Sequence, residues 1–203
     1  MVVWDPPIRD YQFLYHELLP AIETVQRLGY TDFNADFLDS LIEGWATHCE
    51  EVWLPINQLG DREGLKFEDG KITMPQEFKD AYRQGIDEGW LSTTCELEHG
   101  GMGVPLFFQA VTWAEFGTSA CMALSVLPAL SIGVYEVLVK HGRQDLIDYF
   151  ATNLASGEWS GTMCLTEPHA GTDLGIIETK AIPQDDGTYR LSGSKCFITY
   201  GEH

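Results

Sequence analysis

The sequence is poor in positive charge. Only 12 of its 203 residues are Lys or Arg, against 31 Asp or Glu, and the formal net charge is −19. Because a protein that binds nucleic acid needs a basic surface, this balance excludes a nucleic-acid partner. The chain is 44% apolar and 12% aromatic, which is too apolar for a disordered acidic tail and ample for a packed core.

Cysteines are few and scattered. The sequence has five, with no Cys-x-x-Cys pair, and an odd, scattered set fits reduced thiols better than a disulfide framework. Residues 1–7 carry neither the basic segment nor the apolar run of a secretory leader. We therefore expect a cytoplasmic protein.

Three common catalytic or cofactor-binding patterns are missing. The six histidines show no His-Glu-x-x-His motif and no convergent spacing, so no metal site is expected. Gly101 and Gly103 lack the third glycine and the preceding strand of a dinucleotide fingerprint. Gly-x-Ser-x-Gly, the nucleophile motif of many esterases, is also absent.

A long uncharged run covers residues 116–135 and is long enough to span a membrane. It contains Pro128, two glycines and several serines, and no cluster of Lys or Arg flanks it. We therefore expect no membrane span. The run instead predicts a pair of core helices that is broken near Pro128.

Residues 1–157 are predicted to form an all-helical bundle domain. Apolar residues recur at helical spacing over 9–28, where Gly29 is the stop signal, and over 34–59. Further helices are predicted over 75–88, 106–139 and 143–155, and a loop or small hairpin over 61–74. An acidic stripe on the second helix is either a solvated surface or a docking face for a partner. The stripe consists of Asp36, Asp39, Glu43 and Glu50.

After Gly157 the apolar period changes from 3.6 to 2, which predicts strands. They are expected over 159–166, 178–183, 188–192 and 195–200, with a hairpin turn at 184–187. The predicted fold class is therefore α+β, with the helical domain followed by the first strands of a β-barrel-like domain over 158–203. So small a sheet leaves an exposed edge, and we expect a truncated piece of a longer protein.

Residues 161–175 carry the stronger of two functional signals. Gly171 permits positive φ in a loop that follows a predicted strand. The hydroxyl groups of Thr166 and Thr172, with free backbone N–H groups around Gly171, can hold an anion or a polar heterocycle. A plain strand–turn–strand connection is the alternative.

The second signal lies in residues 191–201. Phe197 and Thr199 are expected on the same face of a strand, where a ring and a hydroxyl group can pack and hydrogen-bond a flat heterocycle. A core phenylalanine beside a surface threonine is the alternative.

Together, after a helical half, the two segments resemble the acyl-CoA dehydrogenase family. Cys164-Leu-Thr-Glu-Pro-x-Ala-Gly-Thr-Asp is similar to its flavin signature, and Ser192-Gly-Ser-Lys-Cys-Phe-Ile-Thr-Tyr-Gly to its second flavin-contacting strand. Glu98-His-Gly-Gly-Met-Gly-Val-Pro105 is similar to its Gly-Gly-x-Gly loop. The ending Phe-Ile-Thr-Tyr-Gly-Glu-His most resembles the large bacterial subgroup that includes methylmercaptopropionyl-CoA dehydrogenase-like enzymes.

The resemblance implies FAD as the cofactor. Met163 stands where many relatives carry an aromatic residue, and Phe197 replaces a frequent tryptophan, so we expect altered flavin tuning rather than loss of binding. The residues expected to bind FAD are Met163, Leu165, Thr166, Gly171, Thr172, Phe197 and Thr199.

The resemblance also implies individual roles. Leu165, through its main chain, and Thr166 would contact the isoalloxazine ring. Thr172 would bind the FAD pyrophosphate and lie near the acyl-CoA. Phe197 would pack against the flavin, and Thr199 would hydrogen-bond near N5.

The implied activity is oxidation of acyl-CoA to 2,3-enoyl-CoA, by α-proton abstraction and β-hydride transfer to flavin. The implied partners are an electron-transfer flavoprotein as electron acceptor and further copies of the chain in a homo-oligomer. The apolar helices of 104–139 would wall the acyl pocket. The family's glutamate base is expected beyond residue 203, so no catalytic residue is assigned and the chain alone is expected to be inactive.

Two alternatives remain open at this point. One is an acyl-CoA oxidase on the same fold, in which oxygen accepts the electrons. The other is a non-catalytic helical interaction module that binds a partner through the acidic stripe.

Overall fold

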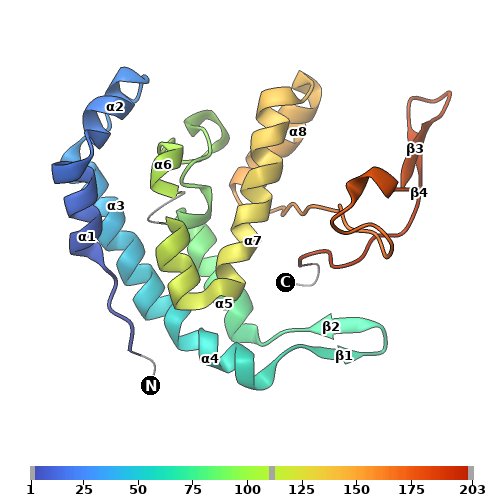
Figure 1. Ribbon diagram of the computed structural model, residues 1–203, viewed down its shortest axis with the longest axis horizontal. Helices are drawn as coiled ribbons and strands as arrows, with labels where there is room; N and C mark the ends of the chain where they lie inside the picture. The colour runs from blue at the N-terminus through green and yellow to red at the C-terminus, as the bar shows by residue number, and fades with distance from the viewer. Residues whose placement is uncertain (1–2, 110–112, 201–203) are drawn as a thin grey trace. The chain divides into compact units, whose positions relative to one another are not determined.

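The computed structural model describes residues 3–109 and 113–200 (Figure 1). The chain divides into two compact units, of which the first ends at Gly161 and the second begins at Thr162. The first unit is helical apart from one small hairpin. The second contains a short 3-10 turn and a second hairpin.

The elements of the first unit are α1 (Ile8–Gln12), η1 (Phe13–Leu18), α2 (Ala21–Arg27), α3 (Ala35–His48), η2 (Cys49–Trp53), α4 (Leu54–Glu63), β1 (Lys66–Glu68), β2 (Lys71–Thr73), α5 (Gln76–Asp87), η3 (Trp90–Ser92), η4 (Leu97–His99), α6 (Leu106–Phe108), α7 (Ala114–His141) and α8 (Gln144–Ala155). Those of the second unit are η6 (Leu174–Ile176), β3 (Lys180–Pro183) and β4 (Tyr189–Ser192).

The helix predicted over 9–28 is interrupted in the structure. Leu19 adopts extended angles (φ −110°, ψ 136°) and separates η1 from α2. The cause is Pro20, because a proline ring clashes with a preceding residue in the helical conformation. The predicted stop is confirmed, since Gly29 follows α2 with φ +105°.

The helix predicted over 34–59 is confirmed and runs further, through α3, η2 and α4. Asn34 caps its beginning, where the side-chain Oδ1 accepts a hydrogen bond of 2.9 Å from the backbone N–H of Phe37. The acidic stripe lies on the outer side of this helix, where three of its four residues are exposed and Asp39 contacts His16 at 2.8 Å. The predicted small hairpin is also confirmed, as β1 pairs antiparallel with β2.

The break in the long apolar segment lies at Cys121 and not near Pro128, so that prediction was wrong. Cys121 has non-helical angles (φ −155°, ψ 96°), while Pro128 lies inside α7. The Cys121 thiol interacts with the backbone N–H groups of Leu124 and Ala123, which caps the restarted helix. Residues 110–112 of the predicted helix pair lie outside the described residues.

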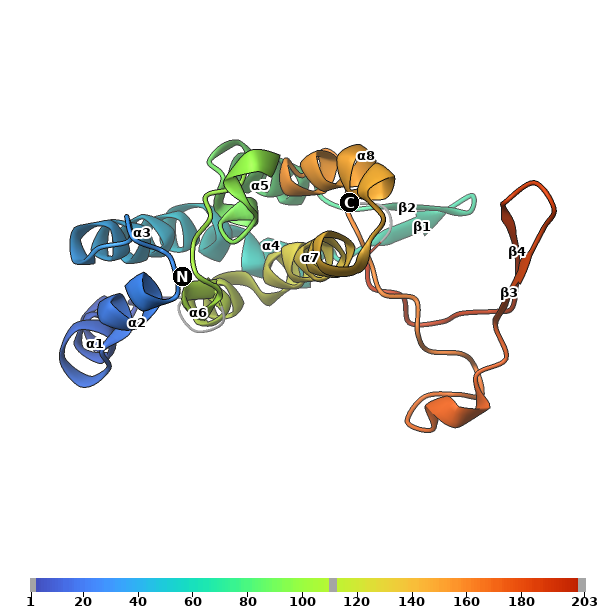
Figure 2. The same ribbon diagram turned by 90° about the horizontal axis from the view of Figure 1, so that it is seen from above.

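Helix α7 is long and apolar enough to cross a membrane by length and composition, with a mean hydropathy of 1.9 over its most apolar window. It packs against α8, η2 and α4 (Figure 2), and residues such as Phe116 and Leu124 are buried. Its burial is not complete, because Met122 and Val137 are each 63% exposed. The absence of a membrane span stays a prediction.

A cluster of tryptophans forms the centre of the first unit. Trp45 and Trp53 are both fully buried, and their rings meet edge to face with centroids 5.0 Å apart. Trp113 stacks on Trp45 at 5.3 Å, and its backbone carbonyl accepts a 3.1 Å hydrogen bond from the Trp45 indole N–H. Aromatic pairs in these geometries stabilise a core beyond the area that they bury.

His48 lies in this cluster, stacked on Trp45, and only 2% of its side chain is exposed. Its Nδ1 contacts a Glu88 carboxylate oxygen at 2.7 Å, while Nε2 is buried without a hydrogen-bond partner among the described residues. Burial lowers the pKa of His48 below its ordinary value of 6.5, although Glu88 acts in the opposite direction.

We therefore expect stability to fall as the pH drops below about 6.5. A His48 pKa that is lower in the folded chain means that the unfolded chain takes up the proton first, which favours unfolding. The measurement is urea unfolding between about pH 5 and pH 7, the range around the ordinary pKa of a histidine in an unfolded chain. His48→Gln should make the stability less dependent on pH, and an unchanged slope in the variant would contradict the assignment.

In the second unit, β3 and β4 form the predicted antiparallel hairpin, with Lys180 opposite Ser192. The turn at 184–187 is also confirmed, since Gly187 N–H donates to the Gln184 carbonyl at 3.1 Å. Residues 159–166 and 195–200 are not strands, so those two predictions were wrong. A strand needs a continuous ladder of backbone hydrogen bonds, and the two segments share a single backbone bond, from Cys196 to Thr166.

Candidate functional site

The candidate site is built where two segments of the second unit lie side by side. The backbone N–H of Cys196 donates to the Thr166 carbonyl at 3.0 Å. Further along, the Thr162 hydroxyl group donates to the Thr199 carbonyl at 2.8 Å. Residues 162–166 and 196–199 are therefore held together although about 30 residues separate them in the sequence.

Glu167 anchors this arrangement. It is only 3% exposed, and its carboxylate accepts hydrogen bonds from the backbone N–H groups of Glu178 at 2.9 Å and Thr179 at 3.0 Å. The Lys195 ammonium donates to the same carboxylate at 2.9 Å and to the Leu165 carbonyl at 2.8 Å. The Thr179 side chain, the Glu178 N–H and the Lys195 ammonium hold the pKa of Glu167 well below its ordinary range, so it is ionised.

A tight turn follows this anchor. Glu167 and Ala170 exchange two backbone hydrogen bonds, of 3.0 and 3.1 Å, and Ala170 is buried. Beyond the turn, a Cβ added at Gly171 would meet nothing within 4 Å, so the backbone there borders open space. The chain then enters η6, where the Asp173 side chain accepts a hydrogen bond from the Gly175 N–H.

The residues expected to bind FAD all lie in this unit and mostly face outward. Phe197 is 90% exposed and Met163 65% exposed, while Leu165 is also exposed and Thr166 is half-buried. Gly171, Thr172 and Thr199 are exposed.

The structure brings only some of these expected FAD-binding residues together. The structure brings Leu165 and Thr166 beside Lys195 and Cys196. Phe197 has a left-handed backbone (φ +54°), so the predicted alternation with Thr199 on one strand face is not formed.

Several donors in this region have no partner inside the described part of the chain. They are the backbone N–H groups of Leu165, Thr166, Gly171 and Thr172. Exposed N–H donors with nearby hydroxyl groups suit the phosphates and ring edges of a nucleotide-like ligand, and exposed apolar side chains suit its flat ring. This chemistry fits the group that the sequence motifs imply.

Glu167 and Lys195 were missed as a pair by the sequence analysis. The sequence motif contains Glu167 but assigns it no role. Lys195 lies 28 residues further on, and a single Glu and a single Lys at that distance form no recognisable spacing. Only the folded turn reveals that they meet.

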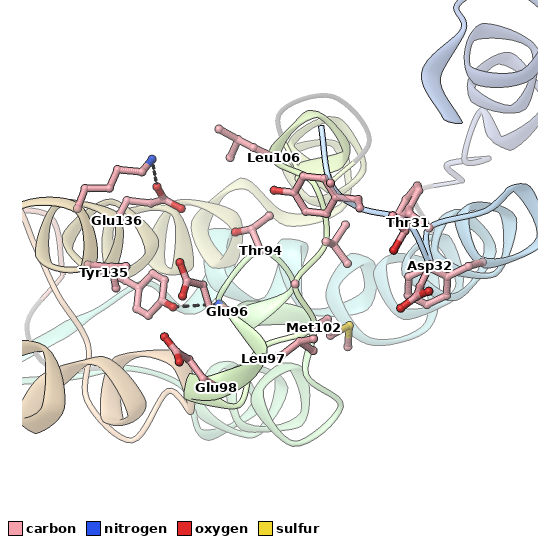
Figure 3. A pocket seen from close by; sticks show the side chains of 18 residues that line it. Thr31, Asp32, Thr94, Glu96, Leu97, Glu98, Met102, Leu106, Tyr135 and Glu136 are labelled. Atoms are coloured by element: carbon pink, nitrogen blue, oxygen red, sulfur yellow. Dashed lines mark hydrogen bonds and ion pairs between the residues drawn. The ribbon is translucent and has the colours of Figure 1, made fainter. Parts of the chain in front are cut away.

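The helical unit holds a separate cavity of about 810 Å³, bounded by residues 29–33, the loop 94–104 and the end of α7 (Figure 3). Its border includes the aromatic ring of Tyr135 and the carboxylates of Glu96, Glu98 and Glu136. An apolar acyl chain would find no uniformly apolar lining there. The implied acyl pocket along 104–139 stays a prediction.

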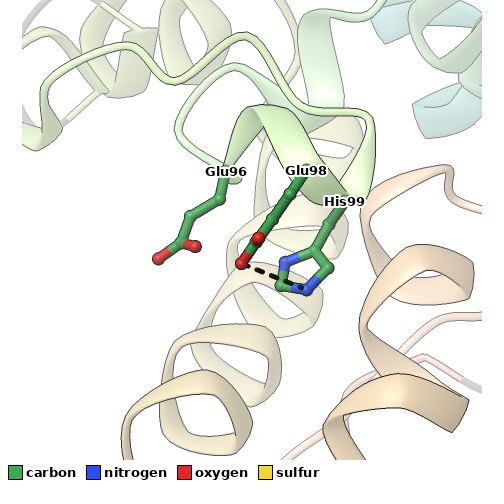
Figure 4. Close-up of side chains that lie close together, drawn as sticks. All are labelled: Glu96, Glu98 and His99. Atoms are coloured by element: carbon green, nitrogen blue, oxygen red, sulfur yellow. Dashed lines mark ion pairs between the residues drawn. The ribbon is translucent and has the colours of Figure 1, made fainter.

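Beside this cavity, Glu96, Glu98 and His99 bring potential metal-ligand atoms within 4.8 Å of one another (Figure 4). The Tyr135 hydroxyl oxygen accepts a 2.9 Å hydrogen bond from the Glu96 backbone N–H and lies 2.7 Å from His99 Nδ1. Burial raises the pKa of Tyr135 to about 12, so its hydroxyl group is neutral. This contact fastens the loop of η4 to α7.

Comparisons with known proteins agree with the two units. Residues 57–158 match the family described as acyl-CoA dehydrogenase, N-terminal domain, and residues 162–203 match acyl-CoA dehydrogenase, middle domain. The chain is 38% identical to a 3-methylmercaptopropionyl-CoA dehydrogenase of Ruegeria pomeroyi, over all of this chain and 34% of that protein. It is 31% identical to a butyryl-CoA dehydrogenase of Syntrophomonas wolfei, over 97% of this chain and 33% of that protein.

Solved structures share the fold. A glutaryl-coenzyme A dehydrogenase in complex with glutaryl-CoA matches 82% of this chain and 40% of its own, with a TM-score of 0.69 at 23% identity. A butyryl-CoA dehydrogenase from Megasphaera elsdenii matches 82% of this chain and 42% of its own, with a TM-score of 0.68 at 24% identity. The predicted fold class, helices followed by strands, is thereby confirmed.

The chain spans about a third of the length of the curated relatives that it matches. Within that third, the two family matches follow each other in order and meet near the boundary between the two compact units. The flavin-signature segments and the helical half thus lie in the order that the sequence motifs led us to expect. The chain belongs to the acyl-CoA dehydrogenase family.

Proposed function

We propose that this chain supplies part of the flavin site of an FAD-dependent acyl-CoA dehydrogenase. The observation that carries the proposal is the paired backbone of 162–166 and 196–199, with its exposed N–H and hydroxyl donors. FAD, when bound, would supply the acceptor for a hydride from the β-carbon of an acyl thioester.

The chain's own residues would bind and orient. The N–H groups of Leu165 and Thr166 would hydrogen-bond the ring edge, and the N–H and hydroxyl groups of Thr172 would bind phosphate. Phe197 and Met163 would cover an apolar face of the ring and exclude water from it.

We also propose an acyl-CoA substrate, an electron-transfer flavoprotein as the electron acceptor, a homo-oligomeric assembly and a cytoplasmic location. The names of the two relatives, dehydrogenases of methylmercaptopropionyl-CoA and butyryl-CoA, support an acyl-CoA substrate. The free thiols, of which Cys49, Cys95 and Cys121 are buried, support a reducing compartment.

The test uses the purified enzyme that contains this chain. We expect yellow protein whose visible flavin absorbance is bleached by an acyl-CoA without oxygen, with an enoyl-CoA two hydrogens lighter found by mass spectrometry. Re-oxidation by electron-transfer flavoprotein supports the dehydrogenase, whereas re-oxidation by oxygen with release of peroxide identifies an oxidase. Colourless protein that binds no FAD would overturn the proposal.

A further inference from the structure

We infer that Glu167 and Lys195 are positioning residues that hold the two flavin-contacting segments in register, an assignment that rests on the proposed function. The pair itself is not expected to touch the cofactor. Its role is to orient the backbone of 162–166 and 196–199 and to leave particular backbone groups free to bind the cofactor.

The carboxylate of Glu167 joins three separate parts of the second unit. The Glu167 backbone is held by the turn with Ala170, and the carboxylate accepts from the N–H groups of Glu178 and Thr179 and from the Lys195 ammonium. At 2% side-chain exposure the carboxylate has little access to solvent, so these contacts supply its hydrogen bonds. The Nε2 atom of His169 lies 3.5 Å from the same carboxylate.

Lys195 connects the carboxylate to the first flavin segment. Its ammonium donates both to Glu167 and to the Leu165 carbonyl, and the next residue, Cys196, bonds to Thr166. Without this ammonium, the described contacts between the two segments reduce to the Cys196–Thr166 backbone bond and the Thr162 hydroxyl bond to Thr199. Neither of these two bonds holds the Leu165 carbonyl.

The double contact of Lys195 also selects the ligand group. Because the ammonium binds the Leu165 carbonyl, the main-chain groups left for a ring edge are the N–H groups of Leu165 and Thr166. The Lys195 ammonium is ion-paired with Glu167, and the Lys195 side chain is only 21% exposed. We therefore do not expect Lys195 to bind a phosphate. Loss of the ammonium would free the carbonyl and leave a buried carboxylate short of its cationic partner.

The test compares FAD affinity, measured by quenching of flavin fluorescence, in the enzyme that contains this chain. Lys195→Met keeps the length of the side chain and removes the charge. We expect it to weaken FAD binding by about tenfold or more and to shift the visible flavin spectrum. Glu167→Gln should weaken FAD binding to a similar extent. The double variant should bind FAD no more weakly than the single variant with the lower affinity. Lys195→Arg, which keeps the charge, should retain most of the wild-type affinity.

The matched control is Lys180→Met, which removes an exposed lysine of β3 in the same unit and should change neither affinity nor spectrum. Circular dichroism confirms that each variant is folded. If Lys195→Met does not fold, the positioning role is tested by hydrogen exchange of the wild type. The Cys196 N–H should be protected before FAD is added, and the Leu165 N–H only afterwards.

The outcomes separate the two proposals. Wild type that binds FAD, together with folded Lys195→Met of equal affinity and spectrum, overturns the positioning role alone. The positioning role is also overturned if the Cys196 N–H of the wild type is not protected from hydrogen exchange. The same holds if the Leu165 N–H is already protected before FAD is added. Wild type that binds no FAD overturns both this inference and the proposed function.

Discussion

Replacing Trp45 with alanine is expected to lower the free energy of unfolding of the chain by about 3–5 kcal/mol. The side chain is fully buried, and its ring stacks on Trp113 with an interplanar angle of 8° and meets Trp53 edge to face. The substitution removes these contacts and leaves a cavity at the centre of the first unit. It also leaves the buried carbonyl of Trp113 without the indole N–H that it accepts.

The measurement is urea unfolding followed by far-UV circular dichroism, which does not depend on tryptophan emission. Trp45→Phe keeps a ring but removes the N–H group, so its free energy of unfolding should lie between those of wild type and Trp45→Ala. Leu28→Ala is the surface control, since Leu28 is 72% exposed, and should stay within about 0.5 kcal/mol of wild type. A Trp45→Ala loss no larger than that of the control would refute the central role of the cluster.

Replacing Gly101 with alanine is expected to cost at least about 2 kcal/mol. A Cβ at this position would overlap the backbone carbonyl of Cys95, which is not a flexible group that can move aside. The loop is also tied on both sides, because Gly101 N–H donates to the Glu96 carbonyl and Gly103 N–H to the Cys95 carbonyl. The chain must therefore shift its backbone or break these bonds.

Thermal and urea unfolding measure this effect, and α7 offers a matched control. Gly133 is exposed in the interior of that helix, and a Cβ there would meet nothing within 4 Å. Gly133→Ala should therefore be neutral or stabilise the chain by up to about 1 kcal/mol. Equal effects of the two substitutions would show that Gly101 is not required by close backbone approach.

The sequence allowed prediction of what depends on neighbours along the chain. The helix over 34–59, the stop at Gly29 and the hairpin turn at 184–187 follow from apolar spacing and turn residues, and all three are present. The interruption at Pro20 was not predicted, and the break predicted near Pro128 is not formed. The break lies instead at Cys121, where the thiol can cap the next turn.

The candidate site was only partly predictable for the same reason. The motif identifies Leu165, Thr166 and Thr172 as a group, and the structure places all three in the second unit. The left-handed backbone of Phe197 and the burial of Glu167 depend on contacts between distant segments. No local pattern encodes either of them.

The anchoring of Glu167 has a consequence for biosynthesis. Its carboxylate meets groups 11, 12 and 28 residues further along the chain, and each of these contacts closes a loop at an entropic cost. The backbone hydrogen bonds within each helix of the first unit, by contrast, join residues about four apart, so these local contacts close only short loops. On a growing polypeptide the turn at Glu167 therefore cannot make all of these contacts until Lys195 has left the ribosome, well after the helical unit has been synthesised.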